Sequence, residues 1–145
     1  MTDLLDVNVL LALFDRDHVD HGIAQEFVST RLEDGWASCP ITQNGFVRII
    51  SQPRYPSPVS TADALVRLSE ATSHDSHVFW ADDASLTDPG VLLAQELLGP
   101  RQVTDAYLLA LAVRHDGRLV TFDSSVPLRA VVGAGPRHLE VRTTP

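Results

Sequence analysis

Short apolar runs alternate along this sequence with longer segments in which apolar residues recur at helical spacing. The runs predict five buried strands, at residues 4–6, 36–38, 77–80, 118–122 and 138–141. Parallel strands need a long crossover connection between them, and this connection is usually a helix. The alternation therefore predicts an α/β fold in which helices cover both faces of a parallel sheet.

The segments between the runs carry local signals for the ends of helices. Ser60, Asp88 and Thr104 are expected to cap the helices that follow them, because their side-chain oxygens can accept hydrogen bonds from the free N–H groups of a first helical turn. Pro40 suits a first helical turn, and Gly117 suits a helix end. Helices are expected at residues 7–14, 21–32, 40–50, 62–70, 88–97, 105–114 and 126–132.

The composition limits the class of protein. We expect a single domain, residues 1–145, which is long enough to bury a core without disulfides. Hydrophobic residues make up 44% of the chain, too many for a disordered protein. The single cysteine, Cys39, excludes an intramolecular disulfide. The longest apolar run, residues 106–113, is too short to cross a bilayer, and the N-terminus lacks a basic leader. We expect a cytoplasmic protein without membrane association.

The charge balance is acidic and unusual in its residue types. The formal net charge is −8, all 11 basic residues are Arg, and 14 of the 19 acidic residues are Asp. The negative charge argues against broad, sequence-indifferent binding of nucleic acids, so a polyanion could approach only with the help of a metal ion or a basic partner. The absence of Lys excludes chemistry that needs a lysine amine.

Three aspartates that are far apart in the sequence are expected to meet at one edge of the sheet. Asp6 and Asp123 each follow a predicted strand, and Asp105 lies in the first turn of a predicted helix. The carboxyl ends of parallel strands share one edge, where ligands bind in open α/β sheets, and a helix that follows a strand begins at the same edge. Taken singly, each aspartate is explained as well by a turn or a helix cap.

Three ionised carboxylates repel one another, and each would have a raised pKa unless a positive charge joined them. A hard divalent cation such as Mg²⁺, which prefers oxygen ligands and keeps several waters, resolves the repulsion. Such an ion can bind a phosphate oxygen and activate a water. The pattern therefore favours hydrolysis of a phosphate ester.

The sequence resembles the PIN-domain nucleases, and within them the VapC-type toxins of bacterial toxin–antitoxin systems. The resemblance spans nearly the whole chain and rests on the order and spacing of four motifs, at residues 4–10, 42–48, 104–112 and 119–123. It implies a three-layer α/β/α sandwich with a small central parallel sheet. It also implies a Mg²⁺- or Mn²⁺-dependent endoribonuclease that cleaves RNA, forms a homodimer and is neutralised by a VapB-type antitoxin.

The resemblance assigns catalytic and metal-binding roles to Asp6, Asp105 and Asp123, with Asn8 steadying the first acid. It also shows a departure, because Gln43 stands where the family usually has a glutamate near the start of an early helix. A glutamine can offer a carbonyl oxygen but adds no charge, so we expect one well-bound ion rather than two.

Several supporting residues have two readings at this point. Thr121 lies two residues before Asp123, so both side chains point the same way along a strand; its hydroxyl can bond either to the acids or to the backbone. Asn8 can equally be a helix cap. His18 and His21 could bind a metal, although capping or packing roles are favoured. Arg48, Arg54 and Arg101 are candidate phosphate contacts by charge, although salt bridges to the many aspartates are the favoured use.

The apolar candidates also have two readings. Trp80 could stack on RNA, but a core aromatic followed by a turn at Asp82 and Asp83 is favoured. A dimer or antitoxin groove is conceivable on two apolar faces, for which core packing is the simpler reading: Ile49 and Ile50, and Leu65, Val66 and Leu68.

Two other functions fit parts of the sequence. Phosphatases and receiver domains also place an acid after the first strand, but they normally need a second acid nearby and a lysine, and position 8 is Asn in a chain without Lys. A catalytically weakened PIN-like module, acting by binding antitoxin or RNA, is suggested by Gln43 and by the net charge of −8.

Overall fold

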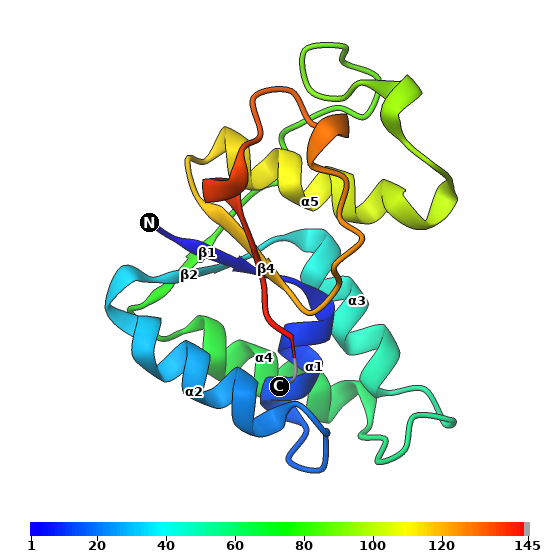
Figure 1. The fold of residues 1–145 in the computed structure, drawn as a ribbon. Coiled ribbons are helices and arrows are strands. Elements are labelled where there is room, and N and C mark those ends of the chain that lie inside the picture. Colours follow the sequence, from blue (N-terminus) through cyan, green and yellow to red (C-terminus); the bar gives the residue numbers. More distant parts are fainter. Residues whose placement is uncertain (144–145) are drawn as a thin grey trace.

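Five short strands form a parallel sheet at the centre of a computed structural model that describes residues 1–143 (Figure 1). The strands are β1 (Asp3–Leu5), β2 (Trp36–Ser38), β3 (His77–Phe79), β4 (Arg118–Thr121) and β5 (Leu139–Val141). They lie in the order β3-β2-β1-β4-β5, and every neighbouring pair is parallel. All five strands expected from the sequence are therefore present, in a single parallel sheet.

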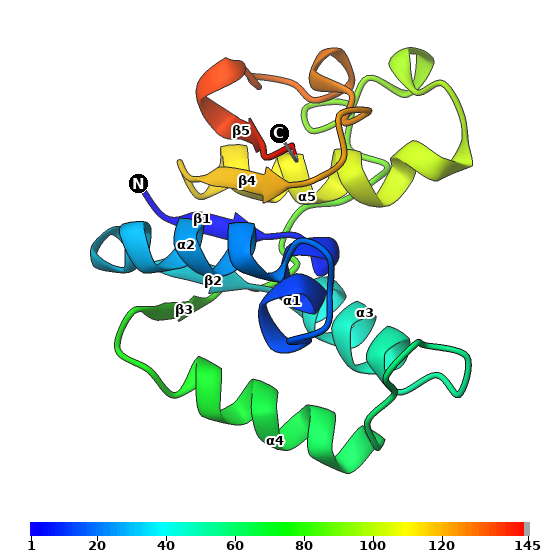
Figure 2. The ribbon, with the colours of Figure 1, turned by 60° about the horizontal axis from the view of Figure 1, so that its bottom comes forward.

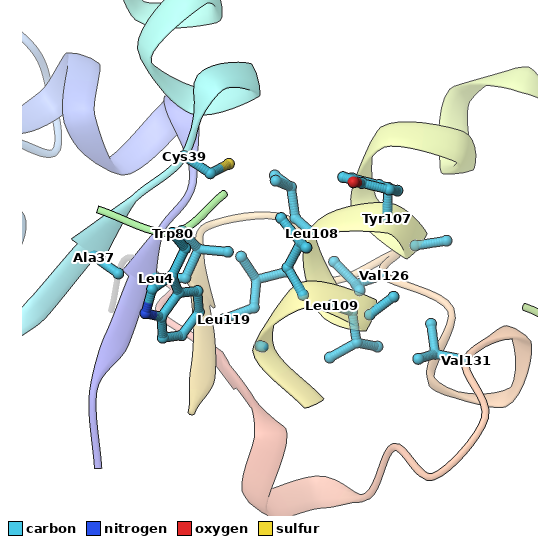
Figure 3. Packing of buried hydrophobic residues seen from close by; sticks show 14 of the residues in the cluster. Leu4, Ala37, Cys39, Trp80, Tyr107, Leu108, Leu109, Leu119, Val126 and Val131 are labelled. Atoms are coloured by element: carbon cyan, nitrogen blue, oxygen red, sulfur yellow. The ribbon is translucent and has the colours of Figure 1, made fainter. Parts of the chain in front are cut away.

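Helices cover both faces of this sheet, and the alternation of side chains along the strands decides which residues face which helices (Figure 2). Leu4, Ala37 and Leu119 pack with the helix α5 (Val103–Arg114), as the cluster in Figure 3 shows. Leu5 and Val120 point to the opposite face. That face is covered by α1 (Val7–Phe14), α2 (His21–Arg31), α3 (Pro40–Ile50) and α4 (Thr61–Thr72). The expected three-layer α/β/α sandwich is confirmed.

Two glycines allow close approaches that fix this arrangement. A Cβ atom on Gly45 of α3 would lie 2.7 Å from Cγ2 of Val7, so only glycine lets α3 pack so closely on α1. A Cβ atom on Gly117 would lie 2.6 Å from both the Thr2 carbonyl oxygen and the Trp80 ring. Gly117 therefore lets β4 lie alongside the start of β1. The left-handed residue of the turn that ends α5 is Asp116 (φ 50°) rather than Gly117, whose N–H donates to Ala112 O (2.8 Å).

The helix expected at residues 88–97 is the largest error of the sequence analysis. This segment forms turns and one short 3₁₀ helix, Ala94–Glu96. Its backbone pairs with a distant segment instead: Leu93 N donates to Ala130 O (2.8 Å), and Val132 N donates to Val91 O (3.0 Å). The helix expected at residues 126–132 is lost to the same pairing and shrinks to a 3₁₀ helix, Leu128–Ala130.

Smaller differences concern where elements begin. The sequence predicts that Thr104 caps a helix that begins at residue 105. The helix α5 begins two residues earlier, at Val103, because a 3₁₀ turn at Pro100–Gln102 runs directly into it. The last strand begins at Leu139 rather than His138, which ends a 3₁₀ turn. Ser60 caps α4 as expected, its Oγ accepting from Asp63 N (3.0 Å).

The topology defines the edge where a site can form. The chain builds β1, β2 and β3 outward in one direction and then returns to place β4 and β5 on the other side of β1. Parallel sheets bind ligands at such a switch point, outside the carboxyl ends of the strands. Because α5 ends where β4 begins, beside Thr2 (Arg118 N to Thr2 O, 3.0 Å), α5 itself begins at the carboxyl edge. Within residues 1–143, no helix is long and apolar enough to cross a membrane.

Candidate active site

Asp6 is the first residue after β1 and caps α1. Its Oδ1 accepts from Val7 N (2.7 Å), and its Oδ2 accepts from the Thr121 hydroxyl (2.7 Å). The residue is 7% exposed. Burial raises the pKa of Asp6; the two hydrogen bonds oppose this rise, and the charge of Asp123 adds to it. Asp6 is therefore a shielded carboxylate held in a single orientation.

Thr121, the last residue of β4, ties the ends of β1 and β4 together. Besides donating to Asp6, its Oγ1 accepts from Asn8 Nδ2 (3.1 Å) and from Asp123 N (3.1 Å). The Asn8 Oδ1 in turn accepts from Phe122 N (3.3 Å). The Thr121 hydroxyl thus makes both of the bonds that the sequence left open, to the Asp6 carboxylate and to the backbone N–H of Asp123. Asn8 bonds to Thr121 and does not cap α1, because Asp6 is the cap.

Asp105 and Asp123 complete the group of acids. Their carboxyl groups lie close enough that each shifts the pKa of the other, and both Asp105 and Asp123 lie close enough to Asp6 for the charges to interact. Burial, followed by repulsion from Asp6 and Asp123, raises the pKa of Asp105 to about 6. Donation from Ser125 Oγ (2.6 Å) and Ser125 N (2.8 Å) lowers the pKa of Asp123. The structure thus brings together the three aspartates that the sequence analysis selected, with Asp123 kept ionised and Asp105 more readily protonated.

No positive side chain neutralises this group. Within the part of the chain that the structure describes, no Arg or His forms a salt bridge with Asp6, Asp105 or Asp123. In residues 1–143 no three His, Cys, Asp or Glu side chains converge closely enough to enclose a metal ion. Mg²⁺ does not require such a cage, because it keeps several waters and is usually held by one or two carboxylates. The oxygen-only donors and the uncompensated charge therefore fit a hydrated Mg²⁺ or Mn²⁺ ion.

Gln43 makes a different contact from the one expected of a site residue. Its Nε2 donates to Ser38 Oγ (3.0 Å), and that hydroxyl also pairs with His77 Nε2 (2.8 Å). The amide of Gln43 is therefore bonded to Ser38 of β2 and reaches His77 of β3 only through that hydroxyl.

A cavity of about 470 Å³ opens beside Asp6. Arg48 of α3, Thr104 of α5 and Asp82, in the loop after β3, also line it. The sequence predicts only a turn at Asp82. It did not predict that Asp82 lines the same cavity as Asp6. The missed signal is that Asp82 follows β3 as Asp6 follows β1 and Asp123 follows β4.

The remaining candidates divide into structural and unassigned residues. His18 Nδ1 accepts from Asp20 N (3.0 Å), and His21 Nδ1 lies 2.7 Å from Ala12 O, so both have the favoured local roles. Trp80 is a core aromatic, 5% exposed and stacked on His115. The salt bridges expected for Arg48, Arg54 and Arg101 do not form in residues 1–143.

Comparison with known proteins agrees with this arrangement. The family model described as "PIN domain" matches residues 4–131, a range that includes all three aspartates. The chain belongs to the PIN-domain family. The resemblance to VapC-type PIN ribonucleases that the motifs indicated is thereby confirmed.

The relatives match almost end to end. The chain is 60% identical to "Ribonuclease VapC44" of Mycobacterium tuberculosis over 139 residues, which cover 96% of this chain and 98% of the relative. It is 44% identical to "Ribonuclease VapC39" of the same species over 135 residues, 92% of this chain and 96% of the relative. A solved chain in "VapBC2 from Rickettsia felis bound to a DNA fragment from their promoter" superposes with a TM-score of 0.64 over 98% of this chain and 99% of that chain; at 13% identity, it supports the PIN fold alone.

Proposed function

We propose that this chain is the toxin of a toxin–antitoxin system and a Mg²⁺- or Mn²⁺-dependent endoribonuclease whose catalytic and metal-binding residues are Asp6, Asp105 and Asp123. The observation that carries the proposal is the close group of three aspartates at the switch point of the sheet, without a basic partner in residues 1–143. The full-length similarity to proteins named ribonucleases supports RNA as the substrate.

Each residue of the group has a definable task. When bound, the divalent ion supplies charge neutralisation at the phosphate and an activated water. Asp123, kept ionised by Ser125, and Asp6, oriented by Thr121 and Val7 N, would hold the ion. Asp105, whose pKa the neighbouring acids raise without metal, would join them once the charge of the ion favours its carboxylate form. Thr121 and Asn8 are positioning residues, because Thr121 donates to Asp6 and Asn8 in turn donates to Thr121.

Arg48 is the candidate contact for the RNA backbone. It is exposed, lines the cavity beside Asp6, and forms no salt bridge in residues 1–143. A guanidinium group binds phosphate well because its N–H groups match two phosphate oxygens. On a chain of net charge −8, an unpaired arginine beside the site offsets part of the repulsion that RNA would meet.

A separate face of the molecule is the candidate surface for a VapB-type antitoxin. An apolar groove of about 520 Å³ runs between α2 and α4 and includes Leu13, Phe14 and Val28. On α4, Leu65 and Val66 are 56% and 55% exposed. Core packing was the simpler expectation for both residues, and it is wrong, because α4 turns only Ala64 and Leu68 into the core. An antitoxin, or a second copy of the chain in a homodimer, would shield such side chains from water.

The test of the proposed activity is RNA cleavage by the purified chain. We expect cleavage with Mg²⁺ or Mn²⁺ and none with excess EDTA. Asp6→Asn and Asp105→Asn should each lose on the order of 10²-fold or more in rate, because charge stabilisation by a metal site contributes several kcal/mol. Asp83→Asn is the matched control, since Asp83 pairs with Arg114 and lies outside the group.

Two results would contradict the proposal. Cleavage that persists in EDTA would exclude metal dependence. Full cleavage by folded Asp6→Asn and Asp105→Asn would exclude these residues from the chemistry. If the wild-type chain binds RNA but does not cleave it under any metal condition, the weakened binding module that Gln43 suggested becomes the better account.

A further inference from the structure

Asp82 is an acid at the site edge that the proposed activity does not yet use. Trp80 N donates to Ser38 O (2.9 Å), which extends the pairing of β2 and β3 beyond Phe79 and carries the chain to the carboxyl edge. Asp82 comes two residues later. It is thus the third aspartate to follow a strand at this edge, after Asp6 and Asp123.

The surroundings of Asp82 leave its charge without compensation. Its Oδ1 is shielded from solvent and has no hydrogen-bond partner within residues 1–143. The neighbouring groups are the thiol of Cys39, which is fully buried, and the ring of Tyr107. Burial first, and then the charge of Asp82 and a side-chain hydrogen bond with it, raise the pKa of the Cys39 thiol. The thiol is therefore neutral, so it offers Asp82 a weak S–H hydrogen bond and no counter-charge. A shielded carboxylate oxygen without a partner destabilises the folded state and is rare in native proteins.

The next residue shows that the fold could have compensated this charge. Asp83 Oδ1 lies 3.2 Å from Arg114 Nε and 3.4 Å from His115 Nε2, both of which belong to the C-terminal end of α5. Of two consecutive acids, the chain pairs Asp83 with the guanidinium group of Arg114. The other, Asp82, has no such pair in residues 1–143 and is among the residues that line the cavity beside Asp6.

We propose that Asp82 supplies a further carboxylate to the divalent-cation site of Asp6, Asp105 and Asp123, and that it provides there the negative charge that Gln43 does not. The inference rests on the proposed function and adds a ligand to the same site. A carboxylate can hold a hydrated ion directly or by accepting hydrogen bonds from its waters. Asp82 therefore need not touch Asp6, and the cavity between them has room for a hydrated ion.

The experiment is a Mn²⁺ titration of the full chain, followed by the loss of the free Mn²⁺ EPR signal. Asp82→Asn and Asp82→Ala should each bind Mn²⁺ about 10-fold or more weakly than wild type, the usual cost of losing such a partner of a metal site. Asp83→Asn, which removes the same charge one residue away, should bind within about twofold of wild type. Without metal, Asp82→Asn should unfold at the same temperature as wild type or higher, because it removes an unpaired shielded charge. Its stabilisation by Mn²⁺ should be smaller.

The outcomes separate this inference from the proposed function. If wild type binds Mn²⁺ and both folded Asp82 variants bind it equally well, Asp82 is not part of the site, although the activity proposal stands. If Asp82→Asn lowers the melting temperature of the metal-free chain and leaves the Mn²⁺-induced shift intact, Asp82 has a structural role and the inference is wrong. If wild type binds no Mn²⁺, both proposals fail.

Discussion

Two groups of shielded acids lie on the same sheet, and only one of them is paired with arginines of the chain. Beneath α2, Asp3 is 1% exposed and pairs with Arg118 (2.8 Å) and Arg31 (3.4 Å). Glu140 of β5 joins the same network through Arg31 and Arg142. At the carboxyl edge, Asp6, Asp105 and Asp123 are gathered with no arginine paired to them in residues 1–143.

This difference shows which group of acids has its counter-charges within the chain and which group lacks them. In both groups burial raises the pKa of an acid, Asp3 to about 6 and Asp105 to about 6. Around Asp3, Arg31 works against this rise, whereas around Asp105 the neighbouring charges of Asp6 and Asp123 add to it. The network under α2 therefore contains its own counter-charges. The group at the edge needs a cation from outside, and this need is the physical basis of the proposed metal site.

The largest effect is expected from Asp123→Asn. Of the two acids in contact, Asp123 carries the charge, because Ser125 lowers its pKa. Its neutralisation should reduce RNA cleavage on the order of 10²-fold or more and leave the fold intact. Cleavage rates under saturating Mg²⁺, with circular dichroism as the folding control, test this; a folded variant of normal rate would break the comparison.

Arg118→Met should show the opposite behaviour, a loss of stability without loss of chemistry. The change keeps the apolar stem of the side chain and removes the closest cation of Asp3. Because Arg118 is partly exposed, we expect about 2 kcal/mol, below the ~3–5 kcal/mol typical of a fully buried pair. Urea unfolding measures it. The control is Arg114→Met, which breaks an exposed pair with Asp83 and should cost ~0–1 kcal/mol; equal losses in the two variants would count against the comparison.

Thr121→Val tests how far the acids depend on their positioning residues. The variant keeps the shape of Thr121 and removes the hydroxyl that donates to Asp6 and accepts from Asn8 and Asp123 N. Cleavage should fall about 10-fold, mainly in kcat, because Asp6 loses its orientation and not its charge. A change confined to KM would mean that Thr121 acts on RNA binding instead.

The smallest effect is expected in the pH dependence of stability. Native Asp105 holds its proton up to a pH of about 6, whereas an ordinary aspartate releases it near 3.8. The native state therefore binds more protons than the unfolded state between these values, and the stability of the metal-free chain falls as the pH rises from about 4 to about 6. Asp105→Asn should show a shallower fall when both proteins are unfolded by urea in EDTA. Parallel profiles would show that Asp105 does not titrate in this range.

Much of the fold could be predicted because its signals are local. The five apolar runs mark the strands, and the acid that follows β1 and β4 marks the edge where the site lies. The helix predicted at residues 88–97 does not form, because pairing with residues 130–132 overrides the local helical signals. No local pattern reveals this contact.

The site was predicted less completely than the fold. The proximity of Asp6, Asp105 and Asp123 follows from topology alone. The environment of Asp82 does not follow from the topology. It depends on which of the two adjacent acids, Asp82 or Asp83, lies beside Arg114 and His115 at the end of α5. Likewise, only the three-dimensional structure shows the amide of Gln43 bonded to Ser38.

The most direct test of the account is a Mn²⁺ titration of wild type beside Asp6→Asn and Asp105→Asn, with the free Mn²⁺ signal as the readout. The account predicts that wild type binds Mn²⁺ and that each variant, still folded, binds it at least about 10-fold more weakly. Equal binding by all three proteins, or none by wild type, would mean that these carboxylates do not share a cation.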